Sequence, residues 1–402
     1  MATNGNTNGV HAHKDVYIVA STRTPIGSYR GSLSSLPATK LAAAAIKATL
    51  DQVPSIAKNQ VQKVIVGQAV QAGCGQSAAK QALVAAGLPY TCRDALVNEV
   101  CASGMQAIIM ATNQIRYLGG DCVVAAGMES MSNAPFYQRR SLPIYGDFRV
   151  EDGLMLDGLT DTFNDCSMGV CAEHTAKIYD ISRAEQDQYA ITSYKRAQAA
   201  HENGTLAQEI CQIEVPGPKG KPSIAVVEDE EFRKVDFDKV TTLRPVFDAQ
   251  GTITAANAST LADGAAACIL VSRLFIDKMD LKPLAKVVSY GESANDPIDF
   301  STAPSAAVTQ AIERAGLTKD DIALWEINEA FSVVALANIK ILGLDKEKVN
   351  INGGGVSLGH PLGMSGAKIV NTLVHNLLTG QYGCASICRG GGGASAIIIQ
   401  KL

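Results

Sequence analysis

The sequence predicts an α/β protein whose two halves repeat one arrangement of strands and helices. Apolar strand patterns alternate with helical patterns from residue 15 to 130, and again from 281 to 402. The strands are continuous apolar runs, which is typical of a largely parallel sheet covered by helices on both faces. With 402 residues, the chain is long enough for more than one domain.

The first half is expected to begin with a buried strand and to continue with Ala-rich or glycine-terminated helices. The expected elements are a strand at 16–22, a helix at 38–52, a strand at 63–70, helices at 76–87 and 101–120, and a strand at 122–130. Glycine at the end of two of these helices is the usual helix stop.

The second half repeats this rhythm. We expect a strand at 284–292, a helix at 305–316, a strand and turn at 323–330, a helix at 363–380 and two strands around a glycine turn at 385–400. Cys101 in the first half and His360 in the second each precede a long helix that ends in glycine. This correspondence indicates an internal duplication.

The region between the halves, 131–280, has a different character. It holds long polar excursions at 138–158 and 216–239. Long ordered loops in a compact enzyme usually form lids or binding segments.

Composition excludes several classes of function. The net charge is −4 without a polybasic run, so a general basic field for nucleic acid is absent. No stretch is apolar enough to predict a membrane span. Charged residues make up 18% of the chain, so we expect much of its surface to be covered by other chains or domains. The first 15 residues resemble neither a secretory signal nor a mitochondrial transit peptide, which favours the cytoplasm over a processed form in the mitochondrial matrix.

The ten cysteines form no CxxC pair, so most are expected to be reduced packing residues. Cys101, in NEVCASGMQ (98–106), is a candidate nucleophile where a strand ends and a helix begins. A helix N-terminus lowers the pKa of a thiol, and the small residues after Cys101 leave room for a bulky substrate. A buried structural cysteine is the alternative.

Two glycine-rich loops carry further candidates. His360 lies in NGGGVSLGHPLGMSGA (352–367), where glycines indicate a close approach of the backbone to a ligand. Cys388 is followed by four glycines, whose amides can point at an oxyanion, although a β-turn explains two of them. Asn328 follows an expected strand, where it either caps a helix or orients a water.

Taken together, VCASGMQA, NEAF, GHPLGMSGA and CRGGGGASA resemble the thiolase family over nearly the whole chain. The branch that the sequence resembles is the short-chain acetoacetyl-CoA thiolases (acetyl-CoA C-acetyltransferases), in particular the potassium-responsive mitochondrial kind of animals. The resemblance implies duplicated α/β core domains with five-stranded mixed sheets, at 1–133 continued by 261–282 and at 283–402. It also implies an inserted, CoA-binding loop domain at 134–260 and a homotetramer built as a dimer of dimers.

The resemblance also implies roles for single residues. Cys101 takes the acetyl group as a thioester, His360 deprotonates it, and Cys388 is the acid/base of the second step. Asn328 holds a water of one oxyanion hole, and the amides of Cys101 and Gly390 form the other. Residues implied to contact coenzyme A are Met168, Ser259, Arg233, Lys234, Val235 and Tyr194. The residues implied to hold potassium are Tyr194, Ala255, Ala256, Ala258 and Val356.

The sequence departs from the family pattern in places. Ser167 replaces a histidine that is common before Met-Gly, and Gly355 replaces a usual alanine. Ser301 replaces a proline linked to 2-methyl-branched substrates. Arg389 follows Cys388 and either lowers its pKa or points to solvent.

The expected reaction converts two acetyl-CoA into acetoacetyl-CoA and CoA. Coenzyme A thioesters are the substrates, no covalently bound cofactor is expected, and potassium is the one ion that the resemblance implies. The alternatives are a longer-chain 3-ketoacyl-CoA thiolase and a non-catalytic thiolase-like protein that binds CoA or lipid. A ketoacyl synthase normally pairs its cysteine with two histidines, whereas Asn328 and Cys388 take the place of the second histidine here.

Overall fold

The computed structural model describes residues 15–141, 143–217 and 221–402. The expected N-terminal tail, which occupies residues 1–14, lies outside the described residues. Among those that are described, no helix is long and apolar enough to cross a membrane.

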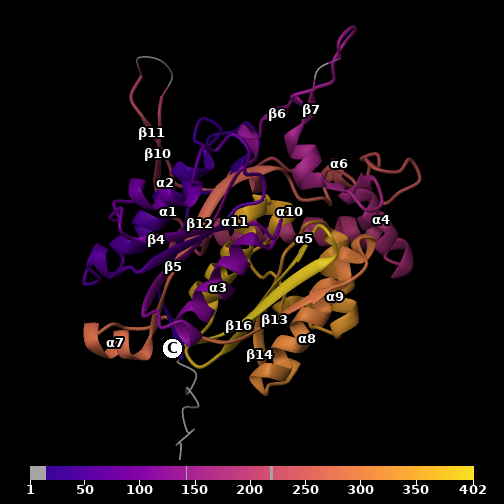
Figure 1. The fold of residues 1–402 in the computed structure, drawn as a ribbon. Coiled ribbons are helices and arrows are strands. Elements are labelled where there is room, and N and C mark those ends of the chain that lie inside the picture. Colours follow the sequence, from indigo (N-terminus) through magenta and orange to yellow (C-terminus); the bar gives the residue numbers. More distant parts are fainter. Residues whose placement is uncertain (1–14, 142, 218–220) are drawn as a thin grey trace, which may run out of the picture.

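One mixed sheet of ten strands runs through the described part of the molecule (Figure 1). Its first half has the order β4 (Arg93–Val97), β3 (Lys63–Gly67), β5 (Cys122–Ser130), β12 (Ala262–Ser272) and β1 (Val16–Arg23). The short β2 (Gly27–Ser28) pairs with β12 off this path. β3 is parallel to β4 and β5, and β12 is antiparallel to β5 and β1.

The second half continues the same sheet. Its order is β14 (Ile322–Ile327), β15 (Tyr382–Arg389), β16 (Gly393–Lys401) and β13 (Ala285–Ala294). β14 is parallel to β15, and β16 is antiparallel to both of its neighbours. Antiparallel pairing of β1 with β13, with Val16 opposite Val287, joins the halves.

The order and directions of the strands repeat between the halves, which confirms the expected duplication. β3, β5, β12 and β1 correspond to β14, β15, β16 and β13. The expected mixed sheet flanked by helices is confirmed, and the first half has the expected five strands. The expectation of a largely parallel sheet is wrong, because most neighbouring strands are antiparallel. The sheet is continuous, and the position that corresponds to β4 is reduced to one parallel bridge between Trp325 and Val349.

Helices cover the sheet in layers. α1 (Ala38–Asp51) and α2 (Ala78–Ala85) pack on the first half, and α8 (Ala303–Ala315) packs on the second, beside α9 (Ser332–Leu342). α3 (Ser103–Tyr117) and α11 (Leu362–Asn376) lie between the two halves and contact each other. Small residues permit this contact, because a Cβ atom at Gly104 would lie 2.7 Å from the carbonyl oxygen of Gly363. The first turns of the two helices are therefore held together by backbone contact.

The region between the halves forms short hairpins and helices that surround this core. Its hairpins are β6 (Phe136–Tyr137) with β7 (Glu151–Asp152), β8 (Thr160–Asp161) with β9 (Cys166–Ser167), and β10 (Ile213–Val215) with β11 (Ile224–Val226). The helices are α4 (Met168–Ile178), α5 (Arg183–Glu202) and α6 (Phe237–Val240), while α7 (Arg273–Met279) follows β12 and α10 (Gly355–Leu358) precedes α11. The β6–β7 and β10–β11 excursions project from the body (Figure 1).

Candidate active site

A mostly apolar cavity lies where the N-terminal ends of α3 and α11 meet the region between the halves. Cys101 and His360 both line it. Its apolar walls are Met131, Met155, Leu159, Met168, Phe247, Ala258, Leu261, Phe300, Ala330, Phe331 and Leu362. Such a cavity with a few polar groups is the usual form of a small-molecule site.

Cys101 lies in the turn between β4 and α3, as the sequence predicts. Val100, just before it, has a φ of 46°, a strained conformation for a β-branched residue. Burial raises the pKa of the Cys101 thiol to about 12, although the amides of Gly390 and Cys101 itself act to lower it. The expected lowering by the helix N-terminus is therefore wrong for the protein without substrate, because desolvation of the thiolate outweighs the amide donors.

His360 lies in the loop between α10 and α11, and burial lowers the pKa of its imidazole to about 4. Its Nδ1 atom lies 2.6 Å from Oγ of Ser365, whose hydroxyl donates to the carbonyl oxygen of Pro361 over 2.9 Å. Since the single hydroxyl proton of Ser365 is donated to that carbonyl, Ser365 accepts a hydrogen bond from the protonated Nδ1. The Nε2 atom of His360 is therefore unprotonated and able to act as a base.

Asn328 follows the last residue of β14, and its Nδ2 lies 3.4 Å from Nε2 of His360. The helix-cap interpretation of Asn328 is wrong, because α9 begins only at Ser332. The side-chain amide instead faces Nε2 of His360, the nitrogen that can act as a base. A molecule bound to Nε2 would therefore also be within reach of Asn328.

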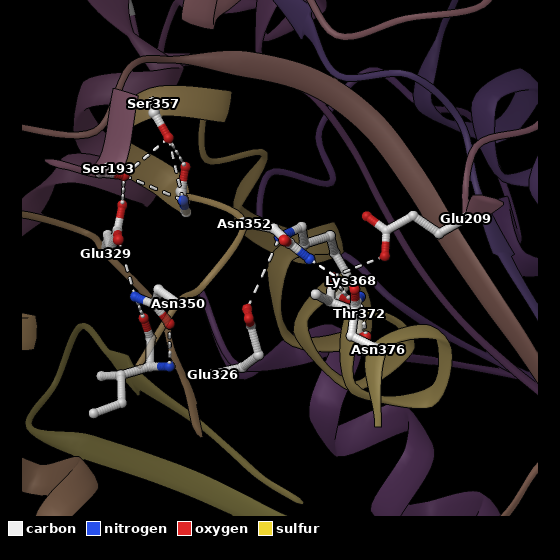
Figure 2. A network of polar contacts seen from close by, with 12 residues as sticks. Ser193, Glu209, Glu326, Glu329, Asn350, Asn352, Ser357, Lys368, Thr372 and Asn376 are labelled. Carbon is white, nitrogen blue, oxygen red and sulfur yellow. Dashed lines mark hydrogen bonds and ion pairs between the residues drawn. The ribbon is translucent and has the colours of Figure 1, made fainter. Parts of the chain in front are cut away.

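A buried polar network surrounds Glu329, the residue that follows Asn328 in the sequence, and includes Asn350 and Ser193 (Figure 2). The side chain of Asn350 bonds to both backbone groups of Ile327 over 2.8 Å and donates to Glu329 over 2.9 Å. Glu329 also accepts from Ser193 over 2.8 Å and from the amide of Val356 over 3.1 Å. Fully bonded buried networks of this kind position the residues that they contain.

The same figure shows a second group of polar contacts along α11 (Figure 2). Thr372 donates to Glu209 over 3.0 Å, and Lys368 lies 4.0 Å from Glu326 of β14. Asn352 donates to Asn376 over 2.8 Å. These contacts tie α11 to β14 through Glu326 and to two neighbouring segments through Glu209 and Asn352.

Cys388 and Gly390 lie at the end of β15 and in the turn after it. Cys388 is fully buried, which raises the pKa of its thiol, and the nearby charge of Cys101 raises it further. The Gly390 amide lies close enough to Cys101 to lower the pKa of its thiol. Arg389 pairs with Glu99 over 2.6 Å, and its charge lowers the pKa of Cys101.

The residues implied to contact coenzyme A lie in two places. Met168 and Ser259 line the cavity. Arg233 and Lys234 are exposed and do not line it. Arg233 is paired with Glu228 over 2.6 Å, and Lys234 with Glu231 over 3.4 Å. A phosphate would therefore have to compete with these pairs. Val235 packs against the large core cluster that contains Tyr194.

The residues implied to hold potassium differ in their surroundings. Tyr194 and Val356 belong to one buried cluster, and Ala258 lines the cavity, where it bridges to Phe331. Ala256 is buried, whereas Ala255 is exposed. Within the described part of the chain, the hydroxyl of Tyr194 has no hydrogen-bond partner. This hydroxyl oxygen can therefore accept a cation or a water.

The three substituted positions near the cavity have different surroundings. Ser167 lines the cavity directly. Ser301 is fully buried beside the cavity residue Phe300, and its carbonyl accepts from Asn338 over 2.8 Å. Gly355 begins α10, where a Cβ atom would lie 2.8 Å from the carbonyl oxygen of Glu329, so the glycine permits a tight contact there.

Sequence reasoning missed two residues that support the site. Ser365 sets the tautomer of His360, and Glu129 in β5 accepts from the amides of Ala69 and Gly363 over 2.9 Å each. Burial raises the pKa of Glu129 to about 8. Glu129 could have been found from the sequence, because an acidic residue in the largely apolar strand at 122–130 indicates a buried carboxylate with hydrogen-bond partners. The only sequence signal for Ser365 was its place near His360.

Comparisons with known proteins agree with this arrangement. The model of the thiolase N-terminal domain matches residues 16–274, and that of the thiolase C-terminal domain matches residues 281–401. The chain is 53% identical over 388 residues to the mitochondrial acetyl-CoA acetyltransferase of Danio rerio, covering 96% of this chain and 92% of the relative. It is 52% identical to the human protein of the same name over 390 residues, covering 97% and 91%.

The fold is also similar to solved structures. A thiolase from Ascaris suum, crystallised with coenzyme A, superposes with a TM-score of 0.93 at 46% identity, covering 97% of this chain and all of the other. The family models together cover most of the chain, and the relatives cover nearly all of it. The chain therefore belongs to the thiolase family.

Proposed function

We propose that the protein is an acetyl-CoA acetyltransferase that condenses two acetyl-CoA into acetoacetyl-CoA and CoA, and that also runs the reverse thiolysis. The observation that carries this proposal is the meeting of Cys101 and His360 at one apolar cavity, with Cys388 and the Gly390 amide close enough to Cys101 to affect its electrostatics. Cys101 comes from the first half of the fold, and His360 and Cys388 from the second. The names of the mitochondrial relatives support the same activity.

In the first half-reaction, Cys101 attacks the carbonyl carbon of acetyl-CoA. The pKa of about 12 makes Cys101 a thiol at neutral pH, so a base must take its proton as the carbon–sulfur bond forms. Nε2 of His360 is unprotonated and serves as that base. Cys388 gives its proton to the sulfur of the departing CoA, which leaves acetyl-Cys101 and a Cys388 thiolate.

In the second half-reaction, the Cys388 thiolate takes a proton from the methyl group of another acetyl-CoA. The resulting enolate carbon attacks the carbonyl of acetyl-Cys101. The Cys101 sulfur leaves and recovers its proton from His360, so that all groups return to their starting states. The amides of Cys101 and Gly390 stabilise the oxyanion on the acetyl-enzyme, and His360 with a water on Asn328 stabilises the enolate oxygen.

The loop segment 134–260 is proposed to be the CoA-binding domain, inserted between the core domains at 1–133 with 261–282 and at 283–402. Its residues Met168, Phe247 and Ser259 line the cavity, which supports this division. The pantetheine arm is proposed to run past Met168 and Ser259. Arg233 and Lys234 are proposed to exchange their carboxylate partners for phosphate at the nucleotide end, near Val235 and Tyr194.

Three further features are proposed for the protein. A potassium ion is held by the Tyr194 hydroxyl and the carbonyls of Ala255, Ala256, Ala258 and Val356. The chain forms a homotetramer, which is supported by exposed apolar side chains such as Ile144 and Tyr145 on the β6–β7 excursion. The relatives' names favour the mitochondrial alternative, and nothing in the comparisons supports the cytoplasmic expectation.

Mass spectrometry after exposure to acetyl-CoA tests the activity. The protein should gain about 42 Da on the peptide that contains Cys101, and Cys101→Ala should not. An intact enzyme without an adduct and without condensation would favour the non-catalytic alternative. Thiolysis rates on 3-ketoacyl-CoA substrates of increasing length distinguish the proposed short-chain enzyme from a longer-chain 3-ketoacyl-CoA thiolase. Equal rates on four-carbon and ten-carbon substrates would indicate the longer-chain enzyme.

A further inference from the structure

Three possible metal ligands meet at the start of α4, beside the cavity but outside the catalytic set. They are Asp161 at the end of β8, Cys166 in β9 and Cys171, the fourth residue of α4. One ligand atom from each lies within 4.8 Å of the others. Asp161 and Cys171 are buried, and Cys166 is half-buried.

Two of the three distances between these atoms are close to those of a tetrahedral metal site. The two sulfur atoms are 3.6 Å apart, and the sulfur of Cys171 lies 3.8 Å from Oδ2 of Asp161. A tetrahedral zinc ion with bonds of about 2.3 Å to sulfur and 2.0 Å to oxygen has edges of about 3.8 Å between two sulfurs and about 3.5 Å between sulfur and oxygen. A cation could therefore enter between the three atoms with small side-chain adjustments.

The carboxylate of Asp161 is already oriented by its own turn. Its Oδ1 accepts from the amide of Phe163 over 3.1 Å, and its Oδ2 accepts from Nδ2 of Asn164 over 2.5 Å. Each carboxylate oxygen has a second lone pair, so these bonds leave a position for a metal. They also act as the outer hydrogen bonds that usually orient a metal-binding carboxylate.

The donor set selects the class of cation. Two cysteine sulfurs and one carboxylate favour zinc or another thiophilic divalent cation over magnesium or calcium, which prefer oxygen ligands alone. Because Cys166 is partly exposed, a cation and a water for the fourth position can reach the site from solvent.

We propose that Asp161, Cys166 and Cys171 form a site for a thiophilic divalent cation such as zinc. Binding releases the protons of the two thiols and forms two metal–sulfur bonds and one metal–oxygen bond. The site clamps the segment 166–171, of which Ser167, Met168 and Gly169 line the cavity. The proposal rests on these three residues alone, so it does not depend on the proposed acetyltransferase activity.

Cobalt(II) is a suitable probe because its bonds to thiolate absorb in the near ultraviolet and its tetrahedral complexes absorb in the visible. The reduced protein would be titrated in a Cys101→Ser/Cys388→Ser background, which removes metal binding by the catalytic cysteines. We expect both absorptions to saturate at about one cobalt per chain, and zinc to displace them because it binds such sites more tightly.

Variants in the same background locate the cobalt. Cys166→Ser and Cys171→Ser should each abolish the thiolate band, and Asp161→Asn should weaken binding at least about tenfold. Cys211→Ser, a half-buried cysteine outside the cluster, should leave the titration unchanged. Circular dichroism and thermal melting without metal verify that each variant folds. Cys166→Ser should disturb folding less than Cys171→Ser, because Cys166 is only half-buried.

Three results would overturn the proposal. The first is the absence of saturable cobalt absorption in the folded, reduced background protein. The second is a thiolate band that survives in both folded cysteine variants. The third is a disulfide between Cys166 and Cys171 that persists under thiol reductant and leaves no thiols for the metal.

Discussion

The Nδ1 atom of His360 lies 2.6 Å from the hydroxyl oxygen of Ser365, and that contact decides which nitrogen of the imidazole can act as a base. Ser365 uses its proton on the carbonyl of Pro361, so Nδ1 must donate to it. The free lone pair of Nε2 consequently faces Asn328 and the cavity. Ser365 is a positioning residue, since it acts on the reaction only through His360.

Ser365→Ala should therefore lower kcat by about 10- to 100-fold, less than the roughly 10²–10⁴-fold loss expected when the base itself is removed, while KM changes little. The loss follows because the imidazole of His360, without Ser365 as an acceptor, no longer keeps its proton on Nδ1, so Nε2 is less often available as the base. Steady-state kinetics over a range of pH would measure it. Ser289→Ala is the matched control, because Ser289 also donates to a carbonyl in a buried place but lies outside the site. Equal kinetics of the two variants would contradict the role of Ser365.

The buried imidazole of His360 also predicts a pH dependence of stability. Its pKa is about 4 in the folded protein and about 6.5 in an unfolded chain, so between these values the unfolded state binds a proton that the native state does not. The contribution is intact above pH 6.5 and is lost as the pH falls toward 4. We expect a loss of about 2 kcal/mol between pH 7 and pH 5.

Urea unfolding of the wild type and of His360→Asn at these two pH values would measure the effect. Both proteins retain Glu129 and Glu326, whose pKa values burial raises to about 8, so their opposite contribution cancels in the comparison. The wild type should lose more stability than the variant on acidification. The same loss in both proteins would show that His360 is not the group responsible.

Arg389 predicts a change in the reactivity of Cys101. Its charge lowers the pKa of the Cys101 thiol, and Glu99 partly neutralises that charge. Arg389→Gln should slow alkylation of Cys101 at fixed pH by about two- to fivefold, and Glu99→Gln should speed it by a similar factor, as expected for a partly exposed pair. Peptide mass spectrometry would follow Cys101 alone.

Arg273→Gln, which removes an exposed guanidinium paired with Asp277, should leave that alkylation rate unchanged. Added salt should reduce the difference between the charge variants. If Arg389→Gln and Glu99→Gln shift the rate in the same direction, the electrostatic explanation fails.

The close contact of α3 and α11 predicts that Gly104 tolerates no side chain. A Cβ atom there would lie 2.7 Å from the carbonyl oxygen of Gly363 and 2.8 Å from the amide nitrogen of Ala367, and backbone atoms cannot rotate away. Gly104→Ala should destabilise the protein by about 1–3 kcal/mol. It should also lower kcat, since the helices that carry Cys101 and His360 at their starts are pushed apart.

Thermal melting and kinetics measure these effects. The control is Gly204→Asn, because Gly204 has a φ of 78° with open space around it, and asparagine tolerates this conformation. A melting temperature of Gly104→Ala at or above that of the wild type would contradict the predicted overpacking.

The proposed potassium site predicts a specific loss in Tyr194→Phe. The wild type should react faster in potassium than in sodium, and the variant should react at the same rate in both, because the hydroxyl is a ligand. Tyr17→Phe, whose hydroxyl bonds to Asp15 instead, should retain the difference. A potassium response that survives in Tyr194→Phe would remove the tyrosine from the site.

Much of this fold could be read from local patterns. The long helices before which Cys101 and His360 lie were expected within a few residues of their observed bounds, because apolar periodicity and glycine stops are local signals. A strand was expected to end before Cys101, but the bounds Arg93–Val97 were not predicted, since these residues are at most partly buried at a sheet edge and their pattern is weak. Its counterpart at Val349 is a single bridge, which no local pattern reveals.

The sequence by itself determined the fold class, the duplication and the candidate residues Cys101, His360, Asn328 and Cys388, because reactive side chains among glycines form a local signal. Only the tertiary structure decided their electrostatics. Burial depends on what the rest of the chain places around a group, so it raised the pKa of Cys101 where the helix N-terminus alone predicted a lower one. The contacts of His360 with Ser365, and of Cys166 with Cys171, likewise appear only after folding brings the atoms together.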